Sequence, residues 1–409
     1  MAYFGGVGGV GGVGGVGGVG GVGGVGGVGG VGGVGGVGGV GGVGGVGGVG
    51  GIGAYNNPET TDALIRHRDG IVGAWQAPAV PGAGFAHPLD SDGPFELWEP
   101  WCRAAILDVE LLSHVQLTRN DEQLAFVDSS GTNITKTVEQ FTLWNLKTVT
   151  SSAVPAVTAE RIASMVRPTL ATFTAQLALV EAYSDLREDR ASEILSQMTP
   201  QYAFWSSVTG LHPTRMRWTC ELLDAALRLA NFVEMRFKQA LACRRPHEYS
   251  PQIQPMIQAP GHGSLPSGHS TEAHAVAYVL CALRRVASSS STPATPPLLT
   301  EQLMRQAARI AINRTVAGLH FPVDSAAGQL LGLTLGEYLV ARCTGAAFDA
   351  WRFNGEAYPV DLDFDFRNQF DTAHGVRKTA AYAGPLTAGT ADLAPRLSWL
   401  WKKAQAEWA

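Results

Sequence analysis

Apolar residues recur at intervals of three and four positions along most of the chain beyond residue 99. This spacing is that of the buried face of an amphipathic α-helix. A loop rich in serine, threonine and proline at 288–297 interrupts the pattern. The segments with helical spacing are 99–116, 158–198, 213–242, 267–288, 300–317 and 324–342. The pattern therefore predicts a body that is mainly α.

One short segment, 360–366, instead alternates strictly between apolar residues and three aspartates. A calcium-binding loop starting at the first aspartate would need glycine at its sixth position and glutamate at its twelfth. The chain has Phe366 and Thr372 at those positions. We therefore expect a short strand or an extended edge with solvated carboxylates.

The C-terminal segment 396–409 carries Trp401 and Trp408 seven residues apart. This spacing predicts an amphipathic helix that docks either on the body of its own chain or on a second subunit. We expect packing within one chain, and a homodimer is the alternative.

The N-terminal part of the chain is a different kind of polymer. From Gly5 to Ile52 it repeats the triplet Gly-Gly-Val sixteen times, with isoleucine in place of the last valine. So much glycine leaves little apolar surface to offset the entropy of ordering the backbone. We therefore expect residues 1–54 to be a disordered tether, with self-association as the alternative, ahead of one domain at 55–409. The stretch after Tyr55, rich in proline, glycine and aspartate up to about Pro100, suggests an extended arm.

Composition excludes several classes of protein. The net charge is −5 and no basic block occurs, which argues against nucleic acid as a partner. No uninterrupted apolar run is long enough for a membrane span, and the first residues lack the basic and leucine-rich regions of a secretory signal. The five cysteines are scattered and never spaced as CxxC, so neither a disulfide scaffold nor a zinc finger is expected. We expect a cytoplasmic protein with reduced thiols.

Lys238 and Arg245 form the first cluster of candidate functional residues. Seven residues are close to two helical turns, so we expect both side chains on one helix face, with Pro246 ending the helix. Two cations at a helix end can bind an anion. Taken alone, the pair is more typical of a solvated basic edge.

The second cluster is Pro266-Ser267-Gly268-His269, which opens the predicted helix 267–288. The first N–H groups of a helix lack intrahelical partners and favour negative charge. Gly268 would let an anion approach the backbone, and Ser267 would add a hydroxyl donor. His269 would lie at the rim, where a group that titrates near neutral pH can transfer protons. An isolated motif of this kind is also typical of a capped turn with a surface histidine.

The third cluster comprises Arg314, Gly318, His320 and Asp324. Gly318 can break the helix and turn His320 back toward Arg314. If a new helix starts near Pro322, the Asp324 carboxylate reaches one imidazole nitrogen of His320 and fixes its tautomer. The other nitrogen is then free to attack or ligate the central atom of an anion.

The three clusters occur in order within 238–324 as Lys-x6-Arg-Pro, Pro-Ser-Gly-His and Arg-x5-His-x3-Asp. This combination resembles the signature shared by vanadium-dependent haloperoxidases and the type 2 phosphatidic acid phosphatase superfamily. The resemblance implies a helical bundle of the haloperoxidase and acid phosphatase type, with its motif core at 213–342. One position departs from the signature, because Asn313 stands where a serine usually precedes the arginine. The asparagine amide can still donate a hydrogen bond.

The resemblance also implies a role for each residue. Lys238, Arg245 and Arg314 would bind the equatorial oxygens of a phosphate or vanadate, and Ser267 with the Gly268 N–H would complete the cradle. His320 would ligate vanadium in a haloperoxidase, or form a phosphohistidine in a phosphatase. His269 would be the general acid–base, Asp324 would orient His320, and Lys238 would also polarise bound peroxide.

Three features favour a peroxidase over a phosphatase as the predicted function. The lipid phosphatases of the superfamily lie in the membrane, whereas this chain lacks predicted spans. A long stretch precedes the first motif, as in bacterial haloperoxidases. His262 stands seven residues before His269, where bromoperoxidases carry a second histidine, although a histidine in a flexible loop would look the same. We therefore expect oxidation of a halide, bromide in the first instance, by hydrogen peroxide to hypohalous acid.

Two alternatives stay open. A phosphatase would hydrolyse phosphomonoesters in the same pocket. An oxyanion-binding scaffold without catalysis is the second alternative, and it would leave His269 and the pair of His320 and Asp324 without a use.

Overall fold

The computed structural model describes residues 58–76, 93–128, 130–149, 156–199, 201–287 and 297–408. The chain divides into two compact units, 1–86 and 87–409. In the first unit, helix α3 (Pro58–Ile71) lies where the sequence suggested an extended arm. Its first residue is a proline, which suits a helix start, and Arg66 and Asp62 form an ion pair one turn apart, at 3.0 Å. The predicted tail at 1–54 lies outside the described residues.

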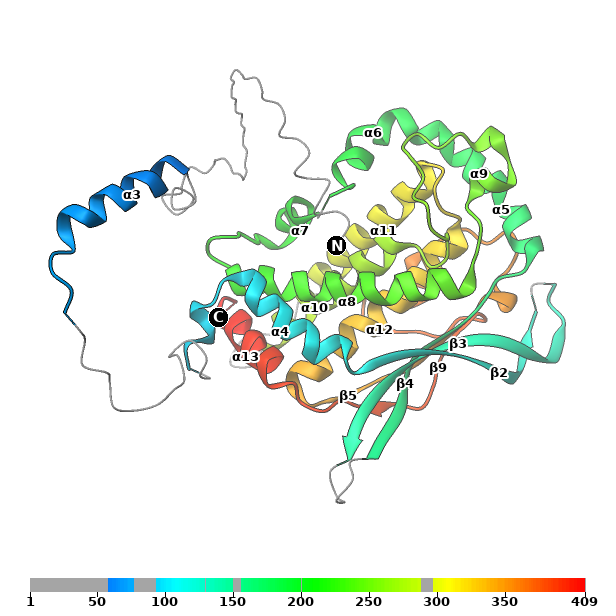
Figure 1. Cartoon of the computed structure of the whole chain (residues 1–409). Helices are drawn as coiled ribbons and strands as arrows, with labels where there is room; N and C mark the ends of the chain where they lie inside the picture. Colours follow the sequence, from blue (N-terminus) through cyan, green and yellow to red (C-terminus); the bar gives the residue numbers. More distant parts are fainter. Residues whose placement is uncertain are drawn as a thin grey trace. The chain divides into compact units, whose positions relative to one another are not determined.

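The second unit contains most of the helices that the structure describes (Figure 1). Helices α8, α10, α11 and α12 pack against one another and carry most of the apolar core. Helix α12 is buried on nearly all its faces, as expected of a helix at the centre of a domain. The helices of this unit are α4 (Pro100–Leu112), α5 (Leu170–Ala182), α6 (Arg187–Ser196), α7 (Tyr202–Thr209), α8 (Arg217–Leu241), α9 (Pro246–Tyr249), α10 (Gly268–Ala287), α11 (Pro297–Val316), α12 (Pro322–Thr344) and α13 (Pro395–Ala406).

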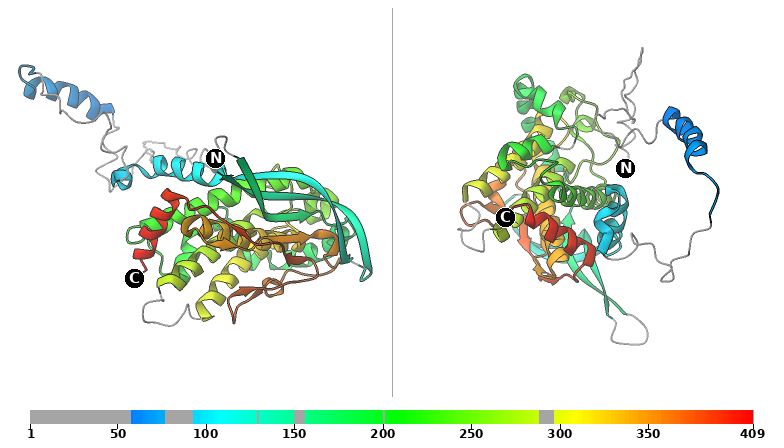
Figure 2. Two further views of the ribbon diagram at one scale, coloured as in Figure 1. Left: turned by 90° about the horizontal axis from the view of Figure 1, so that it is seen from below. Right: turned by 90° about the vertical axis from the view of Figure 1, so that its left-hand side faces the viewer.

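A five-stranded mixed sheet is the main departure from the predicted fold. Its strand order is β2-β3-β4-β6-β9, in which β4 and β6 are parallel and the other neighbours antiparallel. The sheet contacts α12 and α8 (Figure 2). Its strands are β2 (Val115–Val127), β3 (Asn133–Val149), β4 (Ala156–Val166), β6 (Trp351–Asn354) and β9 (Ala383–Pro385). The prediction of a mainly α helical bundle is therefore wrong.

The pattern of apolar residues does not predict these strands, for two physical reasons. The buried positions of β3 include Gln140, Thr142 and Asn145, so its inward positions do not read as apolar. The end of β4 is buried at five consecutive positions, because both of its faces are covered. A short, mostly apolar run cannot be distinguished from a helix by its periodicity, so the pattern predicts a helix at 158–166 as part of the segment 158–198.

The remaining elements are short. Two small pairs of strands join β5 (Ala347–Phe348) to β10 (Gly389–Thr390) and β7 (Phe370–Asp371) to β8 (Val376–Arg377). The 3₁₀ turns are η4 (Gly93–Leu97), η5 (Tyr183–Leu186), η6 (Pro251–Ile253), η8 (Gly355–Ala357) and η9 (Phe366–Asn368).

The predicted strand at 360–366 does not form in this described part of the chain. Two of its aspartates instead form hydrogen bonds outside any sheet. Asp363 accepts a hydrogen bond from the Tyr183 hydroxyl at 2.7 Å, and Asp365 caps the turn η9 by accepting from the Arg367 N–H at 2.9 Å. Local bonds from a side chain to the backbone, such as that of Asp365, compete with strand pairing.

A stripe of glycines on α12 lets α10 approach closely. A Cβ added at Gly328 would lie 2.7 Å from the carbonyl oxygen of Ser267, and one added at Gly332 would lie 2.3 Å from that of Thr271. The starts of the two helices are joined by a hydrogen bond of 2.9 Å from the Ser267 N–H to the Asp324 carbonyl. This packing brings the second and third sequence motifs together.

The C-terminal helix α13 docks on the body of its own chain, as the sequence predicts. Its Trp401 is buried, and the indole N–H of Trp408 donates to the Thr219 hydroxyl at 3.0 Å. Glu407 accepts hydrogen bonds from the first N–H groups of α8. Among the described helices, none combines the length and the apolar character needed to cross a bilayer.

Candidate active site

Lys238 and Arg245 do not share one helix face, because α8 ends at Leu241. Ala242 follows in a left-handed conformation with φ of 50°, and Arg245 lies in extended backbone just before α9. The expectation of a continuous helix up to Pro246 is therefore wrong. Both side chains are nevertheless buried. The Lys238 ammonium donates to the carbonyl oxygens of Ser264, at 3.3 Å, and Pro266.

The Arg245 guanidinium links two loops of the site. It donates to the carbonyl oxygens of His262, at 3.0 Å, and Leu319, at 3.0 Å. One of its terminal nitrogens lies 3.4 Å from Nε2 of His320, and the other lies 3.2 Å from Nδ1 of His262. Arg245 thus links His262, which is exposed, to His320, which is buried.

His320 is held by Asp324 in the arrangement that the spacing suggested. Helix α11 ends at Val316, Gly318 has φ of +78°, and α12 restarts at Pro322. Asp324 Oδ2 lies 3.1 Å from His320 Nδ1 and accepts the Phe321 N–H at 2.9 Å. The carboxylate therefore keeps the imidazole proton on Nδ1 and leaves the Nε2 lone pair facing Arg245.

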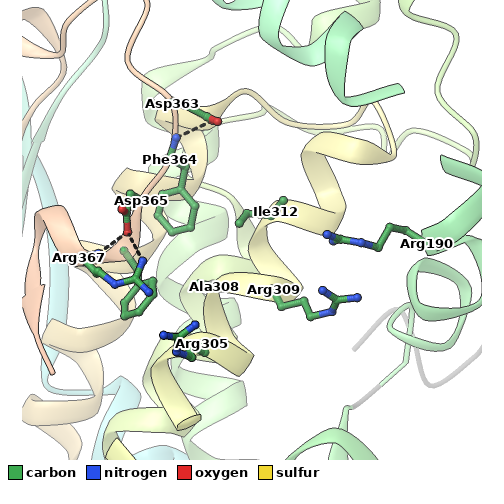
Figure 3. A pocket seen from close by; sticks show the side chains of 10 residues that line it. Arg190, Arg305, Ala308, Arg309, Ile312, Asp363, Phe364, Asp365 and Arg367 are labelled. Carbon is green, nitrogen blue, oxygen red and sulfur yellow. Dashed lines mark hydrogen bonds and ion pairs between the residues drawn. The ribbon is translucent and has the colours of Figure 1, made fainter. Parts of the chain in front are cut away.

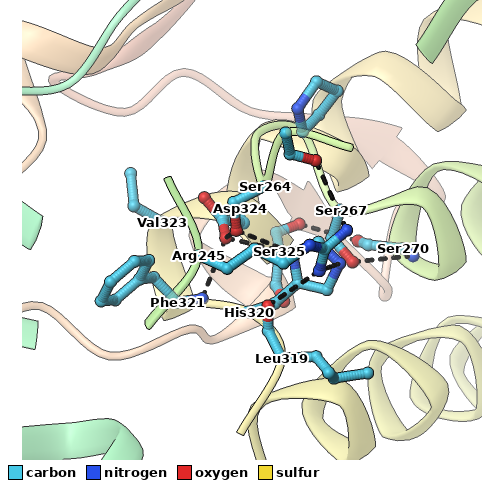
Figure 4. Close-up of polar contacts among 12 residues, drawn as sticks. Arg245, Ser264, Ser267, Ser270, Leu319, His320, Phe321, Val323, Asp324 and Ser325 are labelled. Atoms are coloured by element: carbon cyan, nitrogen blue, oxygen red, sulfur yellow. Dashed lines mark hydrogen bonds and ion pairs between the residues drawn. The ribbon is translucent and has the colours of Figure 1, made fainter. Parts of the chain in front are cut away.

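Ser264 belongs to the same network (Figure 4), although the sequence did not single it out. Its hydroxyl donates to Asp324 Oδ2 and lies 3.3 Å from His320 Nδ1. Burial and the nearby Arg245 lower the pKa of His320 well below its ordinary value, so the imidazole is neutral. Burial raises the pKa of Asp324 to about 6.

Gly268 has a neighbour that the sequence did not predict. A Cβ at this position would lie 2.4 Å from a carboxyl oxygen of Glu234, which is buried on α8. The missing side chain thus accommodates Glu234, whose Oε2 has no hydrogen-bond partner among the described residues. Burial and the neighbouring Glu272 raise the pKa of Glu234 well above its usual range, which favours the neutral acid.

His269 and Arg314 meet at Gln197, a second residue that the sequence did not single out. His269 Nε2 lies 2.9 Å from the carbonyl oxygen of Gln197. Arg314 donates to the Gln197 side-chain oxygen at 3.2 Å and to the Ile194 carbonyl oxygen at 3.1 Å. Nothing in the sequence marks Gln197, whereas Ser264 could have been suspected from its place three residues before Ser267.

The predicted residues therefore fall into two contact groups. Lys238, Arg245, His262, His320 and Asp324 are linked through the loop 262–266. The second group is formed by His269 and Arg314 on either side of Gln197. Charges in each group shift the pKa values of the other, since Lys238 and Arg245 lower that of His269, and His269 lowers that of His320.

Comparison with known proteins identifies the segment that carries these residues. Residues 222–347 match the PAP2 superfamily. All three motifs lie inside this PAP2 segment, so the resemblance to the superfamily is confirmed there, without singling out the haloperoxidase branch. A transmembrane PAP2-type phosphatidylglycerolphosphate phosphatase from Bacillus subtilis aligns with a TM-score of 0.32 and 19% identity, over 41% of this chain and 84% of that chain. No curated protein matches the chain.

His269 of the PAP2 segment should change its protonation when an anion binds. Burial and Arg314 lower its pKa to about 3, so the free protein holds it neutral. Its Nε2–H donates to the Gln197 carbonyl oxygen, so Nδ1 is the nitrogen that gains or loses a proton. A bound phosphate would offset the surrounding cations and raise this pKa by roughly one to three units.

Nitrogen-15 NMR of histidine-labelled protein can measure this shift. The titration of His269, assigned from a His269→Gln variant, should move to higher pH on addition of phosphate. The exposed His374 serves as the internal reference. An identical His269 titration with and without phosphate would contradict the expectation.

A cavity of about 490 Å³ lies outside the two contact groups (Figure 3). Arg190, Arg305 and Arg309 line one side of it, and the segment 363–367 lines the other. None of the predicted site side chains is among the ten described residues around it. Its connection to the site is indirect, because Arg190 donates to Asn313 at 2.8 Å.

Proposed function

We propose that the chain hydrolyses phosphate monoesters, with His320 as the nucleophile. The observation that supports this most directly is the state of its imidazole. Nδ1 is held by Asp324, and Nε2 lies 3.4 Å from the Arg245 guanidinium, where an anionic phosphoryl group would be attracted. The match to the PAP2 superfamily supports the same chemistry.

The proposed reaction has two steps. In the first, the Nε2 lone pair attacks phosphorus and the bond to the leaving oxygen breaks, while protonated His269 gives that oxygen a proton. The products are a phosphohistidine and a free alcohol. In the second, His269 takes a proton from water, the water oxygen attacks phosphorus, and the nitrogen–phosphorus bond breaks to release phosphate.

Buried charge would favour this transfer. Lys238, Arg245 and Arg314 lie in low-dielectric surroundings and offset the charge on the phosphoryl oxygens. Phosphorylation makes the His320 imidazole cationic, and the Asp324 carboxylate stabilises that cation. The cradle would thus be organised before substrate binds.

Vanadate-dependent halide oxidation is the second candidate, and one observation favours it. His262 Nδ1 lies 3.2 Å from Arg245 at the rim, where a second histidine would face a bound oxidant. The residues fit vanadate, because it shares the geometry of phosphoryl transfer and Arg314 has two buried nitrogens without an acceptor among the described residues. His320 would ligate the metal, and Lys238, Arg245, Ser267, Gly268 and Arg314 would hold its oxygens. When bound, vanadate activates hydrogen peroxide toward a halide.

A paired assay separates the two candidates. Vanadate-free protein should release phosphate from an aryl phosphate, and orthovanadate should inhibit this release. Protein loaded with orthovanadate is then given peroxide, bromide and a dione dye. Bromination without phosphate release would favour the second candidate, and the absence of both reactions would leave only an oxyanion-binding scaffold.

A further inference from the structure

Gln197 joins parts of the site that are far apart in sequence. It follows the last turn of α6, is completely buried, and contacts His269 through its carbonyl oxygen. Its side-chain oxygen accepts hydrogen bonds from Asn313 Nδ2, at 2.9 Å, and from Arg314, at 3.2 Å. No other role is assigned to this side chain by the reaction proposed above.

The orientation of the Gln197 amide is determined by its neighbours. Arg314 can only donate, and the Asn313 amide is fixed because Arg190 donates to its oxygen at 2.8 Å. Asn313 Nδ2 also donates to Glu193 at 3.0 Å. Both contacts of the Gln197 side chain therefore require its oxygen, so its NH₂ group must point away from them.

That NH₂ group is buried and has no acceptor within the described part of the chain. Arg314 has the same deficit at Nε and at one terminal nitrogen. A buried N–H donor without an acceptor is unfavourable. Gln197 and Arg314 contact each other and both carry such donors, which indicates that an acceptor binds beside them. An oxyanion carries several acceptor oxygens and negative charge, which suits both.

We propose that the Gln197 side-chain amide donates a hydrogen bond to the bound phosphoryl group, beside Arg314. This assignment rests on the proposed function, since it names a further ligand of the same anion. It also gives Asn313 a role. Its amide donates to the Gln197 side-chain oxygen at 2.9 Å and thereby fixes the orientation of the Gln197 amide.

Two variants test the donor against a purely structural role. Gln197→Met removes both the donor and the acceptor at similar volume. Gln197→Glu keeps an acceptor oxygen for Asn313 and Arg314 but replaces the NH₂ donor by a second oxygen and adds a negative charge, which repels a bound anion. We expect Gln197→Met to weaken binding of inorganic phosphate, measured by calorimetry, by about tenfold or more. Gln197→Glu should bind phosphate more weakly than Gln197→Met. Its binding should recover in part at low pH, because the new carboxyl group then gains a proton and can donate a hydrogen bond.

A direct measurement is the side-chain amide signal of Gln197 in protein labelled with [¹⁵N]glutamine. Phosphate should shift this signal, assigned by its loss in Gln197→Met. The signal of Gln329 is the control, because this buried amide already donates to the Phe366 carbonyl at 2.8 Å. Thermal melting of both variants must stay close to that of the parent protein, so that a folding defect is recognised.

The outcomes separate this assignment from the proposed function. Phosphate binding with an unmoved Gln197 signal and unchanged affinity in Gln197→Met overturns the assignment, as does the absence of phosphate binding to the parent protein. A moving signal and weakened variants without hydrolysis of an aryl phosphate support the assignment and reject the phosphatase.

Discussion

His320→Ala is expected to reduce hydrolysis of an aryl phosphate by about 10,000-fold or more. The substitution removes the Nε2 lone pair, so no phosphohistidine can form. A water molecule would then have to attack phosphorus directly, in place of the positioned imidazole. Phosphate binding should largely persist, because Lys238, Arg245 and Arg314 remain. Steady-state kinetics and calorimetry on the same preparation measure the two effects separately.

The matched control is His374→Ala, which makes the same change at an exposed histidine paired with Asp371. Its turnover should equal that of the parent protein. Trapping with labelled substrate should give an acid-labile phosphoprotein in the parent and none in His320→Ala. Turnover of His320→Ala above about one hundredth of the parent rate would remove His320 from the role of nucleophile.

The sequence could predict the parts of the site that depend on local backbone geometry. Gly318 and Pro322 mark the end of one helix and the start of the next, and this break brings the His320 imidazole to the Asp324 carboxylate four residues later. A positive φ at glycine and a proline in the first helical turn are local requirements, and they leave a visible trace. The same holds for the start of α10 at Gly268.

Residues that tertiary packing brings to the site have no recognisable pattern in the sequence. Glu234 and Gln197 are buried polar residues that reach the site through distant contacts. Glu234 lies against Gly268, 34 positions away, and Gln197 contacts His269, 72 positions away. Such contacts have no periodicity and no characteristic spacing. The predicted segment 213–242 ends within one residue of α8, but the expectation that the helix continues to Pro246 is wrong. Ala242 ends it in a left-handed conformation, for which alanine gives no signal in the sequence.

The sheet shows the same limit at the level of the fold. Buried polar residues on β3 form hydrogen bonds with neighbouring elements, as where the Thr142 hydroxyl lies 3.0 Å from the Ser164 hydroxyl of β4. The hydrophobic pattern is the main signal for a strand, and it fails where the inward face is polar but hydrogen-bonded. The helices, whose inward faces are apolar, were predicted more closely.

Gly332→Ala is expected to lower the free energy of unfolding by about 2 kcal/mol or more, although alanine favours a helix over glycine by about 1 kcal/mol. The added Cβ would lie 2.3 Å from the Thr271 carbonyl oxygen and 2.9 Å from the His274 Cβ. The first of these is a backbone atom inside α10, so relief requires α10 and α12 to separate. Overpacking therefore outweighs the gain in helix propensity, and denaturant unfolding should show it.

The glycine stripe offers a graded series with its own control. At Gly336 the closest contact is 2.8 Å to the Tyr278 Cβ, a side-chain atom, so Gly336→Ala should cost less than Gly332→Ala. At Gly384 nothing lies within 4 Å, and Gly384→Ala should be nearly neutral. Because Ser267 immediately precedes α10 and α12 carries Asp324, the separation should also reduce turnover in the folded protein. Equal stability of all three variants would show that close packing of α10 on α12 does not hold the site together.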